Sequence, residues 1–389
     1  MILAIDASNI RAGGTVTHLT EVLRSADPLR HGFSKVLVWA NSDLLQRLDD
    51  RQWLHKMADP LLEQADNPFI DRRLLHRVYW QRFRLRHLLA VNKADLLWVP
   101  GGVDSSGFRP VVAMSQNSLP FDIPQIQRYG YSLGAYRLRL LRIAQSRTFL
   151  QSDGVIFVTE YARSTISQAI GLDPKKTIVI NHGSSAQFLR APRVQRALSE
   201  YTFSRPLKLL YVSTIDVYKN QECLSKAIAH LRFKGIPVCL ELVGAALKGP
   251  FHQLNKTLNA VDPRRDFIRY TGPISYEKMH DKFVESDINV FASSSEVFGL
   301  SLIEAMSAGL PIACSNRSAM PELLGDAGVY FDPESSASTA FELHKFISSP
   351  MLRASKADMA FRRAQQFSWV KCAEQTFRYL ATCVRSRQG

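Results

Sequence analysis

Residues 296–304 read Glu296-Val297-Phe298-Gly299-Leu300-Ser301-Leu302-Ile303-Glu304, which places two carboxylates around a glycine turn at the start of a predicted helix. Such a turn presents backbone N–H groups and the positive end of a helix dipole, and both favour an anion. The two acids then stay free to bind neutral hydroxyl groups on either side of that anion. A nucleotide-diphosphate sugar offers this order of hydroxyls, diphosphate and hydroxyls.

A second interpretation of the same stretch needs no ligand. Ser301 and Glu304 have the spacing of a capping box, in which the glutamate folds back onto the start of its helix. Glu296 and the rest of the stretch favour the ligand-binding interpretation, because a motif match gains from its context. The residues alone leave both interpretations open.

Residues 294–312 resemble the E-x7-E block of retaining GT-B glycosyltransferases of family 4, the group 1 type. The resemblance covers both acids, the Phe-Gly turn, a helix of small residues and the following strand, and weaker similarity extends over most of the chain. It implies that Glu296 lies beside the donor sugar and acts in catalysis, and that Glu304 holds the ribose diol. The residues implied to contact the donor around the turn are Phe298, Gly299, Leu300 and Ser301.

The chain has 389 residues, more than one hydrophobic core usually serves, so two domains are expected. Apolar strand-like runs alternate with helix-length amphipathic segments, a pattern typical of parallel sheets covered by helices on both faces. The predicted fold class is therefore α/β, and the resemblance implies GT-B, with two facing Rossmann-like domains and a ligand cleft between them. The domains are predicted at 1–195 and 206–367, and the resemblance implies that a C-terminal helix at 368–385 packs back on the first domain.

The predicted elements follow this alternation. In the first half, strands are expected at 2–6, 35–40, 95–100, 111–115, 154–158 and 177–181, and helices at 16–24, 72–91, 135–151 and 160–170. A polar, basic stretch at 184–205 is the expected linker. In the second half, strands are expected at 207–212, 238–243, 267–270, 288–292, 311–313 and 329–331, followed by a final helix at 369–382.

The cysteine content, the apolar runs and the charge indicate the cellular compartment of the protein. Five cysteines show no paired metal-ligand spacing and are interpreted as reduced thiols. No apolar run reaches membrane-spanning length, and Asp6 comes too early for a signal peptide, so a cytoplasmic protein is expected. Much of the net charge of +14 lies in two segments of the first half, which carry Arg72, Arg73, Arg77, Arg82, Arg84 and Arg86, and Arg137, Arg139, Arg142 and Arg147.

Both arginine-rich segments also contain large apolar residues, a composition suited to peripheral binding on the inner face of the plasma membrane. A solvated basic face on a buried helix is the second interpretation. Binding of nucleic acid is the third, although no helix-turn-helix, zinc-finger or RNA-binding signature accompanies the charge. The partners expected are a nucleotide-sugar donor, a lipid-linked saccharide acceptor and a membrane surface, with no nucleic acid.

Lys219 follows the first predicted strand of the second domain, in the stretch 210–221. A lysine at this position can stabilise the negative charge that develops on a departing diphosphate. The family carries its phosphate-binding lysine here, so the resemblance implies that Lys219 is catalytic. The family commonly has Gly-Arg just after the strand, whereas this chain has Ser213-Thr214, so Thr214 stands where a second cation is usual.

Further loops at strand ends complete the predicted site. Gly244, Thr271, Gly272 and Ile274 resemble the loops that bind the nucleotide base, although a glycine after a strand is often just a turn. In the first domain, Gly13 and Gly14 allow the backbone to approach the donor closely. On the acceptor or sugar side we expect Gln116, Asn117 and His182; Gln116 stands where many relatives have a histidine and has no ionisable group.

Taken with these residues, the resemblance implies a retaining, metal-independent hexosyltransferase-type glycosyltransferase. It needs no cofactor beyond its nucleotide-diphosphate sugar, and it acts in the synthesis of a surface polysaccharide such as lipopolysaccharide. The alternatives are a catalytically silent nucleotide-sugar-binding subunit and a GT-B epimerase. The sequence does not specify the donor sugar, the nucleobase, the acceptor, the linkage or the oligomeric state.

Overall fold

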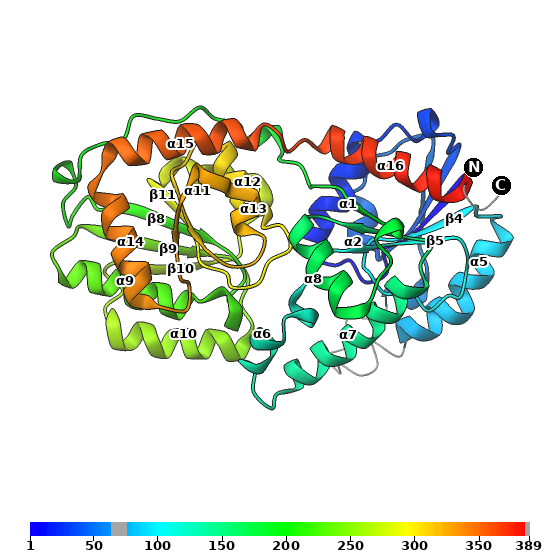
Figure 1. Cartoon of the computed structure of the whole chain (residues 1–389), viewed down its shortest axis with the longest axis horizontal. Coiled ribbons are helices and arrows are strands. Elements are labelled where there is room, and N and C mark those ends of the chain that lie inside the picture. The colour runs from blue at the N-terminus through cyan, green and yellow to red at the C-terminus, as the bar shows by residue number, and fades with distance from the viewer. Residues whose placement is uncertain (64–75, 386–389) are drawn as a thin grey trace. The chain divides into compact units, whose positions relative to one another are not determined.

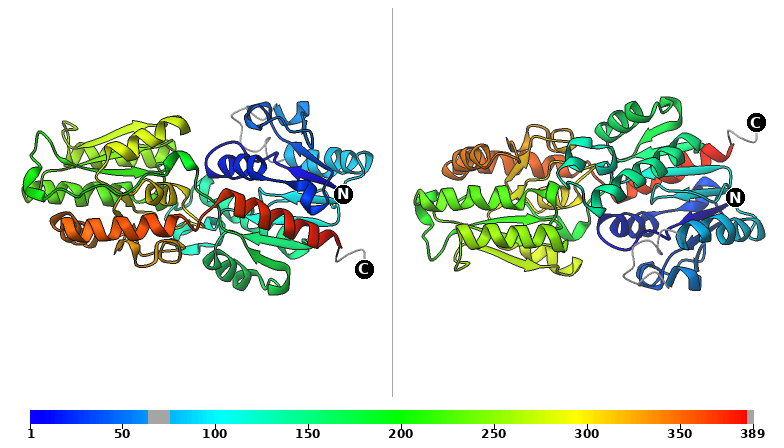
Figure 2. Two further views of the ribbon diagram at one scale, coloured as in Figure 1. Left: turned by 90° about the horizontal axis from the view of Figure 1, so that it is seen from above. Right: turned by 90° about the horizontal axis from the view of Figure 1, so that it is seen from below.

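The computed structural model describes residues 1–63 and 76–385, and the chain forms two compact units (Figure 1). Unit 1 consists of Met1–Phe121, Tyr131–Gly183 and the chain from Ser368 onward. Unit 2 consists of Asp122–Gly130 and Ser184–Phe367. Each unit contains a parallel sheet with helices on both of its faces (Figure 2), so the predicted α/β architecture is confirmed.

The sheet of unit 1 has the strand order β3-β2-β1-β4-β5-β6-β7. Its strands are β1 (Ile2–Asp6), β2 (Lys35–Trp39), β3 (Leu54–Met57), β4 (Leu96–Val99), β5 (Val111–Ser115), β6 (Gly154–Phe157) and β7 (Thr177–Val179). The helices of this unit are α1 (Gly14–Ser25), α2 (Ser42–Arg47), α3 (Pro60–Glu63), α5 (Arg86–Val91), α7 (Leu133–Gln151), α8 (Glu160–Ile170) and α16 (Trp369–Arg385).

The sheet of unit 2 has the strand order β10-β9-β8-β11-β12-β13. Its strands are β8 (Leu207–Val212), β9 (Val238–Val243), β10 (Ile268–Gly272), β11 (Ile288–Phe291), β12 (Ile312–Ser315) and β13 (Val329–Phe331). Its helices are α6 (Ile123–Gln127), α9 (Gln221–Phe233), α10 (Lys248–Val261), α11 (Met279–Glu285), α12 (Leu300–Ser307), α13 (Met320–Leu324), α14 (Ser336–Ser348) and α15 (Pro350–Ala364).

The boundaries of the two units differ from the predicted domains 1–195 and 206–367. Residues 184–195 lie in unit 2, because Ser184 N–H donates to Phe367 O at 3.1 Å and Arg190 N–H donates to Ser307 O at 2.9 Å. Residues 122–130 also belong to unit 2, although the sequence around them belongs to unit 1. A polar linker composition does not reveal such backbone hydrogen bonds.

The C-terminal helix α16 belongs to unit 1 and packs alongside α1 (Figure 1). Phe377 on α16 meets Phe33 edge to face, with ring centroids 6.1 Å apart. Gly183 passes so close to Trp369 that a Cβ atom there would lie 2.2 Å from the Trp369 backbone nitrogen. The last helix of the chain thus completes the core of the first unit.

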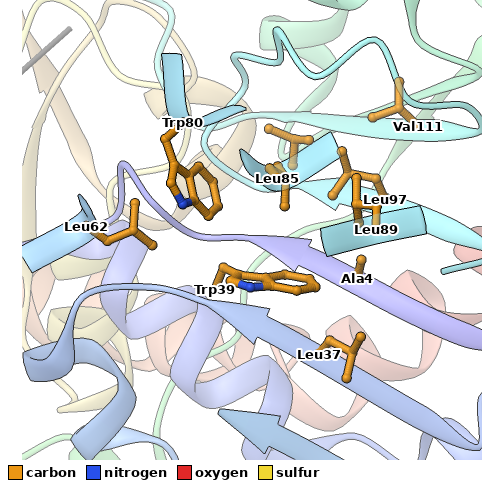
Figure 3. Close-up of a cluster of buried hydrophobic side chains, with 10 residues drawn as sticks. Ala4, Leu37, Trp39, Leu62, Trp80, Leu85, Leu89, Leu97 and Val111 are labelled. Atoms are coloured by element: carbon orange, nitrogen blue, oxygen red, sulfur yellow. The ribbon is translucent and has the colours of Figure 1, made fainter. Parts of the chain in front are cut away.

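A buried apolar cluster covers one face of the unit 1 sheet and is drawn in Figure 3. Trp80, Leu85 and Leu89 come from the helical segment after residue 75 and pack against side chains of four strands. The cluster comprises Ala4, Leu37, Trp39, Leu62, Trp80, Leu85, Leu89, Leu97, Val99 and Val111.

The predicted helix at 72–91 begins outside the described residues. Arg72 and Arg73 lie outside them too. From residue 76 the chain is helical, with a π-helical turn, η3, at Trp80–Leu85. Trp80 and Leu85 are buried, whereas Tyr79 and Phe83 are exposed on the other side of the same segment. Across residues 1–63 and 76–385, none of the helices has the length and apolar character that a membrane span requires.

Trp80→Ala tests how much the cluster stabilises unit 1. We expect the free energy of unfolding to fall by about 3–5 kcal/mol, because the substitution removes a large, fully buried side chain and leaves a cavity. Phe83→Ala lies three residues further along the same segment and is the matched control, with an expected change within about 0.5 kcal/mol because Phe83 is exposed. Urea unfolding followed by circular dichroism measures both, and equal losses would contradict the assignment of the buried face.

Candidate active site

The glycine turn before α12 has the conformation that the sequence predicts. Gly299 precedes α12 in a left-handed backbone conformation, with φ of 74°. A Cβ atom at this position would lie 3.1 Å from Phe291 Cζ and 3.2 Å from Met320 Cε. The positive φ favours glycine, and a Cβ atom would in addition require small shifts of these two side chains. The turn places the start of α12 just after β11, where the first N–H groups of a helix have no intrahelical acceptor.

Ser301 and Glu304 do not form a capping box. The N-cap of α12 is Gly299, without a side-chain cap bond, and Ser301 Oγ donates to Val212 O at 3.0 Å. The Glu304 carboxylate instead accepts from the Tyr276 hydroxyl at 3.1 Å. The capping interpretation of this pair is therefore wrong, and the Glu304 carboxylate is not used to cap its own helix.

Glu304 lies in an apolar environment. Its side chain is buried, with 7% of the residue surface exposed. Burial raises the pKa of the Glu304 carboxyl to about 7, and the hydrogen bond from Tyr276 offsets part of that rise. Tyr276 in turn packs edge to face on Phe188, with ring centroids 5.3 Å apart. Glu304 is therefore partly protonated near neutral pH.

Glu296, the first acid of the stretch, forms an ion pair with Lys219. The Lys219 ammonium donates a short hydrogen bond to the Glu296 carboxylate, and the two side chains are only 12% and 14% exposed. Burial alone would lower the pKa of Lys219, but the neighbouring Glu296 carboxylate outweighs it and the pKa is raised. Lys219 is therefore a stable cation beside the acid.

Asn220 holds these two residues together. β8 and β11 are adjacent in the sheet, so the loops that follow them meet at its carboxyl edge. Asn220 has a left-handed backbone, with φ of 57°, and its Nδ2 donates to Ala292 O and to Ser294 Oγ, both at 2.8 Å. The Ser294 N–H donates to Tyr218 O, also at 2.8 Å. These bonds join the loop of Lys219 to the loop of Glu296.

Residues 122–130 support the same loop from its other side. Arg128 donates to Val217 O at 3.0 Å and to Asn220 Oδ1 at 2.7 Å, and it also pairs with Glu334 at 3.2 Å. The Tyr129 hydroxyl donates to Asp216 Oδ1 at 2.7 Å. The printed partners of Arg128 in this loop are thus the Val217 carbonyl and the Asn220 side chain, and its charge is paired with Glu334.

A pocket of about 400 Å³ opens beside this network. Arg128, Asp216, Lys226 and Glu334 contribute to its wall, and α10 contributes Pro250 and Leu254. Lys219, Glu296 and Glu304 do not line it. The pocket therefore adjoins the loop that carries Lys219, whereas the acids and the lysine at the start of α12 lie outside its lining.

The loops predicted to bind the base gather at the ends of β8, β9 and β10. Gly244 has φ of 142°, and a Cβ atom there would lie 2.2 Å from Ser213 O, so this glycine is required by backbone packing. Its N–H donates to Gly272 O at 3.0 Å. The Thr271 hydroxyl donates to Glu241 at 2.5 Å, and Ile274 is half-buried. A contact with the base by any of these residues stays a prediction.

Thr214, where the family commonly has arginine, is exposed, and its carbonyl accepts from Gln221 Nε2 at 2.9 Å. The other contact of Gln221 in this loop is with Ser213 Oγ at 2.8 Å. The Gln221 side chain thus fixes the turn that follows β8. The neutral amide of Gln221 thus holds the turn that contains Thr214, the residue at the position where the family commonly has a second cation.

The candidates of the first half lie in unit 1. Gly13 is the N-cap of α1 with φ of 70° and has open space around its Cα. Gly14 begins α1, so the glycine pair stands at a helix start. Gln116 Nε2 donates to Pro100 O at 3.2 Å, and Asn117 Oδ1 accepts from the Leu119 N–H at 3.0 Å. Their roles toward a ligand stay predictions.

His182 occupies the core of unit 1. It is 3% exposed, its ring lies 4.4 Å from that of His18 and 5.7 Å from Trp369, and burial holds its pKa well below the usual value. His18, His182 and Cys372 have ligand-type atoms within 4.8 Å of one another. These three residues are buried in unit 1, whereas Glu296 and Glu304 belong to unit 2. That the reaction needs no metal stays a prediction.

Asn220, Tyr276, Arg128 and Glu334 are site residues that the sequence interpretation did not single out. An asparagine directly after Lys219 was a usable signal, because asparagine is enriched in left-handed backbone positions. The partners of Arg128 are distant in sequence, 89 positions away for Val217 and 206 for Glu334, so local patterns do not indicate them.

Comparison with known proteins shows which family and which folds the chain is similar to. Residues 199–364 match the family model described as glycosyl transferases group 1. O-antigen chain mannosyltransferase B of Escherichia coli is 26% identical over 224 residues, which are 57% of this chain and 58% of that protein. The chain therefore spans a little over half the length of that curated relative.

Two solved structures share the fold over nearly their whole length. The crystal structure of Anabaena HepE in complex with UDP and glucose gives a TM-score of 0.69 at 18% identity, covering 97% of this chain and 98% of that one. That of WaaG, a glycosyltransferase involved in lipopolysaccharide biosynthesis, gives 0.70 at 15%, with the same coverage. The resemblance inferred from the motif is confirmed: the chain has the GT-B fold, and its residues 199–364 match the glycosyl transferases group 1 family.

Proposed function

We propose that the protein is a retaining hexosyltransferase that moves a sugar from a nucleotide-diphosphate donor to a saccharide acceptor. The acceptor is lipid-linked, and the product enters a surface polysaccharide. The Escherichia coli relative is an O-antigen chain mannosyltransferase, and WaaG acts in lipopolysaccharide biosynthesis, which supports this assignment. The observation that carries the proposal is the Lys219–Glu296 ion pair beside the glycine turn that begins α12.

The diphosphate binds at the start of α12. The N–H groups around Gly299 to Ser301 offer hydrogen bonds there, and the helix dipole adds a partial positive charge. Lys219 supplies a full positive charge. The negative charge on the departing diphosphate grows as the sugar bond breaks, and these groups stabilise it without rearranging.

Lys219 changes partner when the donor binds. In the free protein its ammonium is paired with Glu296. A diphosphate at the start of α12 competes for that ammonium, and Glu296 then turns its carboxylate toward the hydroxyls of the donor sugar. The ion pair keeps both groups in place before binding, so less ordering is required when the donor arrives.

Glu304 binds the ribose. Its carboxylate accepts hydrogen bonds from the two adjacent hydroxyls, and Tyr276 fixes its direction from the opposite side. Loss of the proton from Glu304 accompanies binding, because an ionised carboxylate accepts two hydroxyl hydrogen bonds whereas the protonated form is a weaker acceptor.

The acceptor attacks the anomeric carbon of the donor sugar from the face on which the diphosphate leaves. Gln116 has no ionisable group, so it positions a sugar hydroxyl but removes no proton. The departing phosphate oxygen takes the proton of the acceptor hydroxyl, and the acceptor oxygen bonds to the anomeric carbon on the same face. This step retains the anomeric configuration. It requires neither metal nor cofactor, and the protein acts at the cytoplasmic membrane surface.

Incubation with a panel of UDP-, GDP- and ADP-sugars tests the proposal. Thermal shift identifies the donor, because a ligand that binds only the folded state raises the melting temperature. The anomeric proton of the product formed on a synthetic saccharide acceptor then reports the stereochemistry by NMR. Retention is expected. An inverted product refutes the retaining mechanism; donor binding without transfer favours the silent subunit, and a changed sugar without acceptor favours an epimerase.

Lys219→Ala and Glu304→Ala separate the two roles. We expect Glu304→Ala to weaken nucleotide-sugar binding about tenfold or more, because it removes a charge-assisted acceptor. We expect Lys219→Ala to lower kcat by about 10²-fold or more with a smaller change in binding, since its charge matters most in the transition state. Calorimetry and initial rates measure these effects. Exposed Lys278 is the control, and Lys278→Ala leaves both quantities unchanged.

The pKa of Glu304 predicts a pH dependence of donor affinity. Because the free protein holds this proton with a pKa of about 7, affinity for the nucleotide-sugar rises as the pH increases through 7. The expected gain between pH 6 and pH 8 is roughly tenfold, from the change in the ionised fraction. In Glu304→Gln the affinity is lower and independent of pH over this range. A wild-type affinity that falls as the pH rises would contradict the role of the carboxylate.

A further inference from the structure

The helix α7 of unit 1 has an apolar stripe on its exposed side. Its buried side packs on the unit through Ala135, Gln145, Thr148 and Phe149. On the opposite side Leu133, Tyr136 and Ile143 are 79%, 61% and 58% exposed, and Leu140 and Leu150 are exposed in the same line. Positions three, four and seven residues apart lie on one face of a helix. α7, the teal helix in Figure 1, is therefore apolar on its solvent side as well as on its core side.

Arginines border this stripe. Arg137 directly follows Tyr136 and Arg139 directly precedes Leu140, so they lie on opposite sides of it, and both are exposed. Arg147 lies one turn after Ile143, on the same side of the helix as the apolar residues. Residues 129–152 include four arginines and not a single aspartate or glutamate. Over the described parts of the chain, the ion pairs of unit 1 involve neither Arg137 nor Arg139.

An aromatic residue marks the entry to the helix. Tyr131 is fully exposed two residues before α7, and Tyr136 lies in its first two turns. Tyrosine prefers the interface between water and lipid, since its ring is apolar and its hydroxyl is polar. Arginine has a long apolar stem and an anion-binding head, so it can border an apolar surface and reach lipid phosphates at the same time.

We infer that this face of α7, formed by Leu133, Tyr136, Leu140, Ile143 and Leu150 with Arg137, Arg139 and Arg147, docks on an anionic phospholipid bilayer. The helix lies in the plane of the interface, with its apolar stripe among the acyl chains and its arginines at the headgroup phosphates. The charge selects this occupant, because an apolar stripe with exposed arginines along it, on a segment 129–152 that contains no acid, is complementary to an apolar layer covered with anions.

The inference deepens the proposed function, on which its purpose rests: a transferase bound at the bilayer surface meets a lipid-linked acceptor there. Lipid binding itself does not depend on donor, acceptor or catalysis. Vesicle binding and sugar transfer are therefore measured separately. A protein that transfers sugar to a water-soluble acceptor without binding vesicles refutes the docking face alone, whereas one that binds vesicles but no nucleotide-sugar refutes the proposed function alone.

Flotation of the full chain with vesicles tests the docking face. One set of vesicles is phosphatidylcholine, and the other is phosphatidylcholine with phosphatidylglycerol in equal parts. We expect at least tenfold stronger partition onto the anionic vesicles, weakening as salt is added. Leu140→Glu with Ile143→Glu lowers this partition at least tenfold. Arg137→Gln with Arg139→Gln lowers it about fivefold per arginine.

Phe341→Glu on α14 of unit 2 is the matched control, because Phe341 is also exposed and lies beside a cation, Lys345. Its partition is expected to equal that of the wild type. Thermal unfolding and nucleotide-sugar binding of each variant show whether the fold is intact. Equal partition onto neutral and anionic vesicles overturns the inference, as does unchanged partition in both α7 variants. A concentration-dependent dimer that the Leu140→Glu, Ile143→Glu variant disperses would also overturn it, since the face would then join two copies of the chain.

Discussion

The hydrogen bonds of Asn220 are the constraint on which the candidate site depends. Its amide joins the loop after β8 to the loop after β11, and the left-handed backbone at this residue lets the chain turn directly from Lys219 into α9. Without these bonds the lysine and Glu296 would lie on two independent loops. Buried and fully hydrogen-bonded, the amide fixes their separation before any ligand arrives.

The segment 122–130 adds a second layer of support. Arg128 binds the carbonyl of Val217 and the side chain of Asn220, while Glu334 accepts from Arg128, Gln125 and Ser294. Glu334 balances the charge of Arg128, so this arginine stabilises the loop without adding net charge beside Lys219. Arg128 therefore does not replace the cation that the family commonly has at position 214, and Lys219 and the start of α12 are the positive groups that we assign to this site.

The sequence predicted most of the sheets and the turn at Gly299, because buried parallel strands have continuous apolar runs and glycine is the residue that most readily adopts a tight turn before a helix. It did not predict β3, an edge strand in which only Leu54 is buried and which therefore lacks an apolar pattern. It also did not predict that residues 122–130 belong to unit 2 or that Tyr276 contacts Glu304. These features arise from contacts between residues distant in sequence, and composition does not encode such partners.

The environments of the two acids are compatible with the proposed binding of a diphosphate between them. The charge of Glu296 is countered by Lys219 at hydrogen-bond distance. Glu304 is buried, and its pKa of about 7 leaves it partly uncharged near neutral pH. The free site is therefore less negative than its two glutamates suggest. The charge of Glu296 is thus offset by an ion pair, and that of Glu304 is reduced by burial. The start of α12 can therefore attract an anion between the two acids.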